Sequence, residues 1–497
     1  MPPQTSASLR RIALPGLLAL VALAACGTRL PDKDFTAGQQ QVVTGPGGVT
    51  ATTGPNGVVP TLSGLPSAAS SSGGTQSANG NGSGSIAPVA GNKASDIGVT
   101  ANSITIGTIA SKTNPFDPRA FVGPTYGLQA FVQWTNEHGG IHGRRLILKF
   151  CDDQGSGDQN QACVHQLIDS DKVFALASTA ILDYQGAAYV NSKGVPDIGS
   201  QPIDPAFDKY PHLWEIYGDD YPRDGKQFGF NNQLYGGTEI YHWFSKHFPN
   251  VPKVAGIVEY NQSASSRFGH SIAVDLKHEG YDVDEKVVNF ALPDFDSVAI
   301  DFKNHGVQYV YDTIDRAGNV RLCKALDDNK VNVTAKILTP QSWEQSINSD
   351  YKDSQHCANE LWATSNTRNY EDTQYPGVAH FRQQMAALGH GDASSLSEWA
   401  LEGWAGGQWI ADAIASCGAD VTRKCVESFV NAGPKHQYDA HGVLTPRYFV
   451  QRSTPEEPSY NCINVARWVT SKNTWVTQVP DMDKNCYNAT EYPYPAT

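Results

Sequence analysis

Hydroxyl-bearing side chains follow a short apolar strand of this chain and could bind an anionic ligand group. Ser178 and Thr179 stand where that strand ends and a helix begins, so their hydroxyls and the free backbone N–H groups suit a carboxylate. The alternative is a plain helix N-cap, and the two roles are compatible. Ligands of open α/β sheets bind at the carboxyl ends of the strands, so residues after the first and fourth predicted strands are candidates as well. These further candidates are Asn114, Phe116, Ser200 and Gln201.

Motifs of enzyme chemistry are absent from the sequence. It contains no G-x-S-x-G elbow, no G-x-x-x-x-G-K-[S/T] loop and no H-E-x-x-H pair. Asp481 and Asp483 resemble the start of a calcium loop, but Cys486 replaces the required glycine and Tyr492 the closing glutamate. We therefore expect no metal, no cofactor and no catalytic residue. An extracellular enzyme stays open as an alternative, with no residue to assign to it.

Short apolar strands alternate with helical patterns over most of the chain. Ile104–Ile109 alternates and is β-branched, which predicts a strand, and the helical spacing over 124–138 ends at Gly139 and Gly140. The same alternation resumes over 232–339, after an irregular stretch near 200–225. Strict β–α alternation predicts parallel sheets with helices on both faces. The expected fold is therefore α/β, with two doubly wound parallel-sheet domains joined by a hinge.

Each of the two domains is expected to contain two segments of the chain. A strand near 360–364 and long helices near 375–388 and 396–415 follow the second run. They hold too few strands for a third domain, so we expect them to return to the first. The predicted first domain comprises 96–222 and 362–448, and the second comprises 223–361 and 449–497.

The composition is that of a globular protein and argues against some partners. Of 497 residues, 40% are hydrophobic and 18% are charged, which is the balance of a folded chain with a large core. The formal net charge is −13, and no run of Lys or Arg follows the N-terminal segment. A nucleic-acid partner requires a basic face, so it is not expected. An anionic lipid surface is not expected as the main anchor either.

The N-terminus has the pattern of an export signal. Arg10 and Arg11 precede an almost wholly apolar stretch over 12–24, which is too short to span a bilayer as a helix. The sequence Leu23-Ala24-Ala25-Cys26 that follows resembles a bacterial lipobox, and this resemblance implies that Cys26 becomes a lipidated N-terminus. The alternative is an ordinary cleaved signal with an incidental thiol. Residues 27–95 are rich in Gly and Ser, which predicts a disordered tether.

Eight of the nine cysteines remain if Cys26 carries lipid. An even number in an exported chain indicates disulfides, and none of these cysteines has the C-x-x-C spacing of a redox or zinc site. Eight cysteines permit about 105 connectivities. Their order along the chain suggests four local pairs: Cys151–Cys163, Cys323–Cys357, Cys417–Cys425 and Cys462–Cys486.

Four segments in register resemble the type I periplasmic binding proteins of the branched-chain amino-acid receptor kind. The resemblance covers about 99–470 and follows the order of predicted elements. It implies a ligand held between two domains by the loops after their strands. The segments that carry it are Val99–Gly107 (VTANSITIG), Trp134–Arg145 (WTNEHGGIHGRR), Asp152–Gln154 (DDQ) and Gly194–Pro196 (GVP).

The second domain departs from the pattern that this resemblance implies. Amino-acid receptors are expected to offer an acidic residue to the ligand ammonium, where this chain has the neutral Gln341. An expected aromatic hydroxyl matches Phe268, which has none, although Asp312 could supply a charge instead. Phe268 and Trp343 would suit an apolar or aromatic ligand, or would simply pack. A ligand without a free α-ammonium group is therefore expected to bind better than leucine or valine.

The resemblance implies an extracytoplasmic solute-binding lipoprotein that delivers a small organic ligand to an ABC importer. The ligand would be amino-acid-like, an amide or aromatic, and the membrane partner would be an ABC permease. The protein would stand on the outer side of the cytoplasmic membrane through its lipid alone. A ligand sensor of the same fold that signals to a membrane partner is the alternative.

Overall fold

The computed structural model describes residues 41–44, 50–54, 57–60, 89–114, 117–218, 221–431, 437–445, 447–448 and 459–496. The chain divides into two compact units, Met1–Gly80 and Asn81–Thr497. Cys26 and most of the predicted tether lie outside the described residues. Within the predicted tether, the first unit has an antiparallel sheet of β1 (Gln41–Thr44), β2 (Thr50–Gly54) and β3 (Gly57–Pro60).

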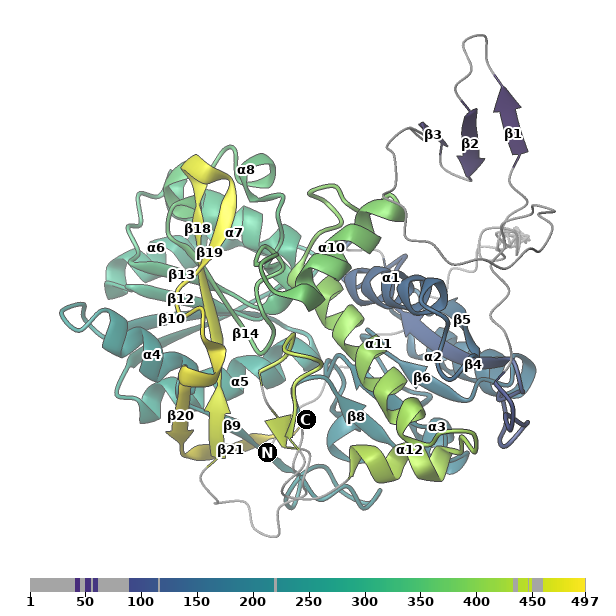
Figure 1. Ribbon diagram of the computed structural model, residues 1–497. Coiled ribbons are helices and arrows are strands. Elements are labelled where there is room, and N and C mark those ends of the chain that lie inside the picture. Colours follow the sequence, from purple (N-terminus) through teal and green to yellow (C-terminus); the bar gives the residue numbers. More distant parts are fainter. Residues whose placement is uncertain are drawn as a thin grey trace, which may run out of the picture. The chain divides into compact units, whose positions relative to one another are not determined.

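The larger unit begins with a five-stranded parallel sheet, around which lobe one is built (Figure 1). The strand order is β5-β4-β6-β7-β8, so the chain winds outward in both directions from β4. β8 lies in the stretch predicted to be irregular. The strands are β4 (Ser103–Ala110), β5 (Arg145–Asp152), β6 (Ala175–Ala177), β7 (Asp197–Ser200) and β8 (Leu213–Glu215). The helices are α1 (Gly123–Glu137), α2 (Gly157–His165), α3 (Ala187–Ser192), α10 (Pro376–Ala387), α11 (Glu398–Ser416) and α12 (Arg423–Val430).

Close packing of α11 on α1 returns the late helices to lobe one, as predicted. A Cβ at Gly127 of α1 would lie 1.7 Å from the Ala400 carbonyl oxygen, so the backbones approach as only glycine permits. Trp404 of α11 packs edge-on against Phe131 of α1, with ring centroids 5.3 Å apart. The two helices run side by side in Figure 1.

Lobe two is built on a seven-stranded mixed sheet in the order β11-β10-β12-β13-β14-β18-β19. The first five strands pair in parallel. β18 pairs antiparallel with β14, and β19 pairs antiparallel with β18. The sheet strands are β10 (Val254–Tyr260), β11 (Asp282–Val288), β12 (Tyr309–Asp312), β13 (Ala335–Leu338), β14 (Leu361–Ser365), β18 (Asn464–Val469) and β19 (Thr474–Thr477). The helices are α4 (Glu239–His247), α5 (Ser263–His278), α6 (Phe295–His305), α7 (Arg316–Asp328), α8 (Ile347–Asp350) and α9 (Gln355–Ala358).

The place of β14 differs from the prediction. The strand near 360–364 was expected to join the first domain, but β14 pairs in parallel with β13 and antiparallel with β18. It is buried throughout, with hydrophobic neighbours on both sides, so the middle of the larger sheet is its stable position. The chain leaves lobe two only after Ser365.

Three small two-stranded pairings complete the unit: β9 (Gln233–Gly237) with β21 (Glu491–Pro495), β15 (Gln437–Tyr438) with β16 (Arg447–Tyr448), and β17 (Ser459–Cys462) with β20 (Cys486–Ala489).

The four predicted disulfides are confirmed: Cys151–Cys163, Cys323–Cys357, Cys417–Cys425 and Cys462–Cys486.

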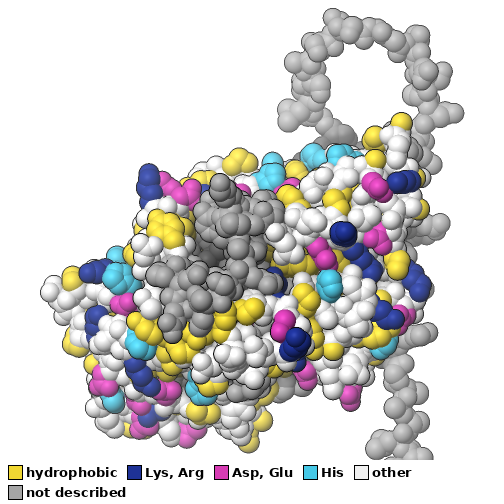
Figure 2. All heavy atoms as spheres, turned by 90° about the horizontal axis from the view of Figure 1, so that it is seen from below, with side chains coloured by type: hydrophobic (Ala, Val, Ile, Leu, Met, Phe, Trp, Pro, Cys, Tyr) yellow, Lys and Arg dark blue, Asp and Glu magenta, His cyan; other side chains and the backbone are white. Residues whose placement is uncertain are grey.

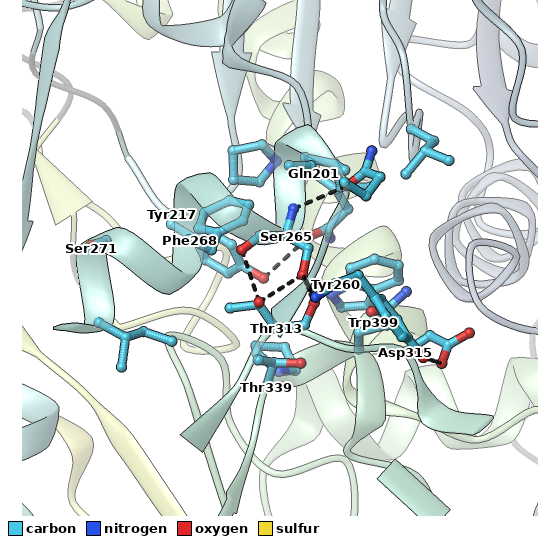
Figure 3. A pocket seen from close by; sticks show the side chains of 18 of the residues that line it. Gln201, Tyr217, Tyr260, Ser265, Phe268, Ser271, Thr313, Asp315, Thr339 and Trp399 are labelled. Atoms are coloured by element: carbon cyan, nitrogen blue, oxygen red, sulfur yellow. Dashed lines mark hydrogen bonds between the residues drawn. The ribbon is translucent and has the colours of Figure 1, made fainter. Parts of the chain in front are cut away.

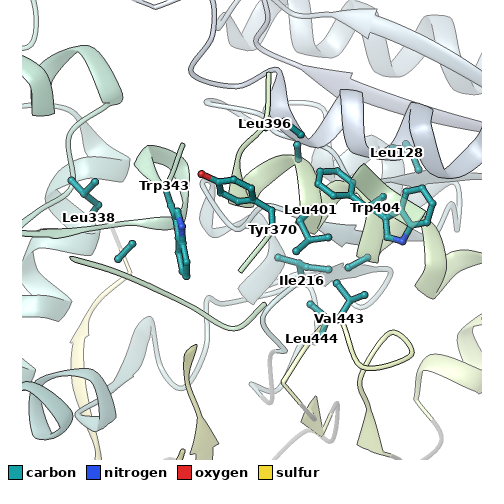
Figure 4. Close-up of a cluster of buried hydrophobic side chains, with 14 of the residues drawn as sticks. Leu128, Ile216, Leu338, Trp343, Tyr370, Leu396, Leu401, Trp404, Val443 and Leu444 are labelled. Atoms are coloured by element: carbon teal, nitrogen blue, oxygen red, sulfur yellow. The ribbon is translucent and has the colours of Figure 1, made fainter. Parts of the chain in front are cut away.

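A single cluster of buried hydrophobic side chains extends through both lobes, from Leu128 and Trp404 to Leu338 and Trp343 (Figure 4). The lobes are therefore joined by packed side chains as well as by the chain itself. On the outside, basic and acidic side chains are interspersed over the face drawn in Figure 2.

Candidate ligand-binding site

A cavity of about 370 Å³ lies between the two lobes. Its walls include residues of β9, α4, α5 and α11. They also include the loops after β6, β7 and β8 in lobe one and after β10, β12 and β13 in lobe two. This is the edge at which open α/β sheets bind ligands, and the volume is typical of a small-molecule site. Most of the lining side chains are apolar or aromatic: Phe121, Leu182, Pro202, Ile203, Tyr217, Ile240, Tyr241, Tyr260, Ala264, Phe268, Ile272, Phe290, Pro340 and Trp399.

The polar residues of the lobe-one wall are tied to a buried acid. Gln201, directly after β7, donates a 2.7 Å hydrogen bond from its side-chain amide to Glu402 of α11. Tyr217, just after β8, donates its hydroxyl to the same carboxyl oxygen at 3.0 Å. Ser365, at the end of β14 in lobe two, donates to the other oxygen at 3.1 Å. Burial raises the pKa of Glu402 to about 7, so this wall holds a weak acid rather than a firmly ionised one.

The lobe-two wall is fixed by hydrogen bonds at the start of α5 (Figure 3). The Ser265 hydroxyl accepts from the Tyr260 backbone N–H at 2.7 Å and shares a 2.8 Å hydrogen bond with the Thr313 hydroxyl. Gln262 caps the helix by accepting from the Ser265 backbone N–H at 3.0 Å. The Tyr260 hydroxyl donates to Asp315 at 2.9 Å. The loops after β10 and β12 are thereby held together, which gives the cavity a defined wall.

The lobes also contact each other through polar side chains beside the cavity. The Gln341 amide of lobe two donates to the Ala120 carbonyl oxygen of lobe one at 3.0 Å. Arg316 of α7 pairs with Asp117 at 2.8 Å. Arg267 of α5, which is buried, pairs with Asp208 at 3.3 Å. These contacts are broken if the lobes separate, so they favour the closed arrangement.

Gln201, Phe268 and Gln341 line the cavity, so the structure brings these three of the predicted site residues together. They come from the loop after β7, from α5 and from the loop after β13. Gln201 and Gln341 use their amide nitrogens to bind Glu402 and Ala120. Phe268 therefore offers an apolar ring, and the two glutamines offer polar edges.

Four other predicted residues of lobe one are buried in its framework and do not line the cavity. Ser178 donates to the Gly403 carbonyl oxygen at 3.1 Å. A Cβ at Gly406 would lie 2.4 Å from the Ser178 hydroxyl, so α11 occupies the space that a ligand would need there. The other three also bond within lobe one: Thr179 to Ser200, Ser200 to Asp197, and Asn114 to Ser111 and Asp117.

Asp312 and Trp343 also lie away from the cavity. Asp312 is buried and pairs with Lys336, whose ammonium group also donates to Asn319 at 2.6 Å. Trp343 is fully buried, with its ring centroid 5.6 Å from that of Trp475. Asp312 therefore balances a charge within lobe two and Trp343 is core packing. Phe116 lies outside the described residues, so its predicted contact stays a prediction.

Several lining residues were not predicted. Tyr217 follows β8, a strand that the sequence pattern did not indicate. Trp399 of α11 packs against Phe121, with ring centroids 6.0 Å apart, and also lines the cavity. Asp275 lies three turns into α5, among the buried positions of the helix. A single carboxylate there belongs to no sequence motif, so the sequence did not indicate it. The rule that ligands bind at the carboxyl ends of strands would have indicated Tyr217 only if β8 had been predicted.

Among the described residues, no group of three or more His, Cys, Asp or Glu is placed to hold a metal ion. None of the described helices is long and apolar enough to cross a membrane.

A family model described as "Periplasmic binding protein" matches residues 103–473. No curated protein matches the chain. Solved structures do match: a fatty acid ABC transporter substrate-binding protein from Thermomonospora curvata is 12% identical, with a TM-score of 0.60, over 81% of this chain and 96% of that one. A solute-binding protein from R. palustris in complex with 4-hydroxybenzoate is 14% identical, with a TM-score of 0.59, over 76% and 96%. A possible leucine/isoleucine/valine-binding protein from Rhodopirellula baltica is 14% identical, with a TM-score of 0.58, over 77% and 98%. At these identities the likeness concerns the fold.

Proposed function

The chain belongs to the periplasmic binding protein family, with the type I fold, and from that premise we propose that it captures an apolar small organic solute between its lobes and delivers it to an ABC importer. The observation that carries the proposal is the interlobe cavity of about 370 Å³, walled by strand-end loops of both sheets and lined mainly by apolar and aromatic side chains. Burial of apolar ligand surface there would be favourable by about 25 cal/mol per Å². Closure around the solute would give an importer a ligand-dependent shape to recognise.

An α-amino acid fits this cavity poorly. Gln341 stands where an acidic partner for the ligand ammonium was expected, and Asp312 is engaged by Lys336. Phe268 offers no hydroxyl. An ammonium group bound beside Gln341 would have no counter-charge there and would cost several kcal/mol, which the amide recovers only in part. A solute without the zwitterionic α-carbon therefore suits these walls better than leucine or valine does.

The ligand class is tested by calorimetry with leucine and its uncharged counterpart 4-methylpentanamide, which keeps the branched body and lacks the ammonium and carboxylate groups. We expect saturable binding of the amide and weaker or undetectable binding of leucine. A thermal shift at 100 times the dissociation constant should correspond to about 2.7 kcal/mol of stabilisation. Tight leucine binding together with no amide binding would refute the preference for an apolar solute over an α-amino acid.

Export and lipid anchoring through Cys26 complete the proposal. They rest on the basic residues Arg10 and Arg11, the apolar stretch and the Leu-Ala-Ala-Cys junction. In cells, Cys26→Ala should release the protein into the medium or leave its signal uncut. Cleaved Cys26→Ala protein that still sediments with membranes would exclude the lipid anchor. Co-purification of a permease with the ligand-loaded protein would test delivery.

A further inference from the structure

Two adjacent glycines of β9 make room for two carboxyl groups at one end of the cavity. A Cβ added at Gly236 would lie 2.3 Å from an oxygen of Asp275, and one at Gly237 would lie 2.3 Å from an oxygen of Glu239. Any other residue at these positions would displace them. Asp275 comes from α5 and Glu239 from α4, so two helices bring acids to the same strand. Gly237 and Asp275 both line the cavity.

Asp275 has an unused hydrogen-bonding position. Its side chain is 1% exposed, and the Ser271 hydroxyl, one turn earlier on α5, donates to Oδ2 at a long 3.4 Å. Oδ1 has no hydrogen-bond partner among the described residues. Buried polar atoms normally have partners, so an unfilled one in a cavity wall points to a ligand group. Ser271 and Trp399 lie on opposite sides of the pocket in Figure 3.

The electrostatics at this end favour a cation. Burial, and then the neighbouring carboxylate of Glu239, raise the pKa of Asp275, and Glu491 of β21 acts in the same direction. Two helix N-termini at the cavity are already capped: Gln262 accepts from Ser265 at the start of α5, and Asp315 accepts from Gly318 at 2.7 Å at the start of α7. The helix α4, which begins beside Gly237, has no side-chain cap, and its first residue is Glu239. An anion would find no cationic side chain in the cavity wall, because none of the described lining residues is Lys, Arg or His. At the start of α4 it would meet the carboxyl group of Glu239.

The nearby guanidinium group does not change this conclusion. Arg267 stacks on Phe268 at 4.6 Å, but it pairs with Asp208 and donates to the carbonyl oxygens of Pro202 and Ile203 at 3.0 and 2.7 Å. Its charge is thus bound by lobe one.

We propose that this end of the cavity is an amine-binding subsite, in which Asp275 pairs with the ammonium group of a ligand whose apolar body fills the rest of the cavity. The inference rests on the proposed function and narrows it, from an apolar solute to an apolar monoamine. A charge-assisted hydrogen bond to Oδ1 of Asp275 would supply the partner that this oxygen lacks among the described residues. A carboxylate of the same shape would meet repulsion at this end instead.

The test is calorimetry with two matched sets, 2-phenylethylamine, 2-phenylethanol and phenylacetate, and the corresponding 4-methylpentyl amine, alcohol and carboxylate. Wild type is compared with Asp275→Asn, which keeps the shape of the side chain, and with Asp315→Asn, which removes the other carboxylate of the wall. We expect at least one amine to bind wild type about 10- to 100-fold more tightly than its alcohol, the range of a hydrogen bond to a charged group. Asp275→Asn should remove this preference and keep alcohol binding, whereas Asp315→Asn should keep it.

Each other result has a distinct meaning. Alcohol binding shows that Asp275→Asn is folded, so loss of amine preference in that variant supports the subsite. Carboxylates that bind wild type as well as the amines overturn it, and so does an amine preference that survives Asp275→Asn or disappears in Asp315→Asn. In each of those cases the proposed function stands. Failure of all six compounds to bind wild type would overturn the subsite and the proposed apolar solute together.

Discussion

Gln201 lines the cavity and donates a 2.7 Å hydrogen bond to the carboxyl group of Glu402, which also accepts from Ser365 at the end of β14. The same buried acid therefore contacts a cavity residue of lobe one and a strand of lobe two. A ligand that moves Gln201 would therefore change the surroundings of Glu402. A movement of the lobes relative to each other would change the hydrogen bond between Ser365 and Glu402, and through Glu402 the position of Gln201. This connection makes the titration of Glu402 a measurable property of the closed molecule.

The first prediction concerns pH. Burial raises the pKa of Glu402 from 4.5 to about 7, so the native state holds this proton more tightly than the unfolded chain does. The resulting stability is present below pH 4.5 and is lost as the pH rises toward 7. At about 1.4 kcal/mol per pKa unit, the loss is about 3 kcal/mol. Urea unfolding of wild type and Glu402→Gln from pH 4.5 to 8 should show wild type losing stability relative to the variant. A difference that does not change with pH would contradict this titration.

The second prediction separates Asp312 from ligand binding. Asp312→Leu leaves the buried ammonium group of Lys336 without its carboxylate, which should lower the free energy of unfolding by about 3–5 kcal/mol. The double variant Asp312→Leu/Lys336→Met should recover most of the loss, because it removes both charges. Urea unfolding measures both variants. Loss of leucine binding in folded Asp312→Asn would instead make Asp312 a ligand counter-charge.

The third prediction compares two disulfides. Cys323 and Cys357 are buried and close a loop with a sequence separation of 34, whereas Cys417 and Cys425 are separated by 8. Replacing the first pair by Ala should lower stability by about 2–5 kcal/mol, and the second pair should cost about 1 kcal/mol less because its loop is shorter. Thermal unfolding of the two variants tests the order. A larger loss from the shorter loop would be inconsistent with loop entropy as the main term.

The fourth prediction distinguishes two aromatic residues that the sequence grouped together. Trp343 is fully buried, so Trp343→Ala should lower the free energy of unfolding by about 3–5 kcal/mol. Phe268 faces the cavity, so Phe268→Ala should weaken the binding of 4-methylpentanamide and change stability little. Calorimetry and urea unfolding on both variants measure the two effects. Equal affinity of Phe268→Ala and wild type would remove Phe268 from the site.

The sequence sufficed for the architecture because that architecture depends on local patterns. The alternation of apolar strands and helices predicted two parallel sheets, and the order of the cysteines predicted the four disulfides that the structure has. The placement of β14 was wrong because its pairing with β13 and β18 depends on contacts distant in the chain. The rule that ligands bind at the carboxyl ends of parallel strands also located the correct edge of each sheet, because the strands themselves were recognisable from local patterns.

Residues within that edge could not be ranked from the sequence alone. Ser178 follows a strand as Gln201 does, but α11 approaches through Gly406 and covers Ser178 while leaving Gln201 at the cavity. That approach joins residues more than 200 positions apart. Asp275 gave no signal either, because the space for its carboxyl group depends on Gly236, in a strand that precedes α5. Packing between distant segments therefore decides which polar groups are available to a ligand.

Blocking the cavity tests the central claim most directly. Ala264 lines the cavity at the start of α5, whereas its neighbour Ser263 is exposed and does not. Wild type, Ala264→Trp and Ser263→Trp are titrated with N-phenyl-1-naphthylamine, an uncharged apolar fluorophore that brightens away from water. A solute site between the lobes predicts saturable binding to wild type and Ser263→Trp, and its loss in Ala264→Trp without loss of thermal stability. Unchanged binding to Ala264→Trp, or no saturable binding to wild type, would contradict it.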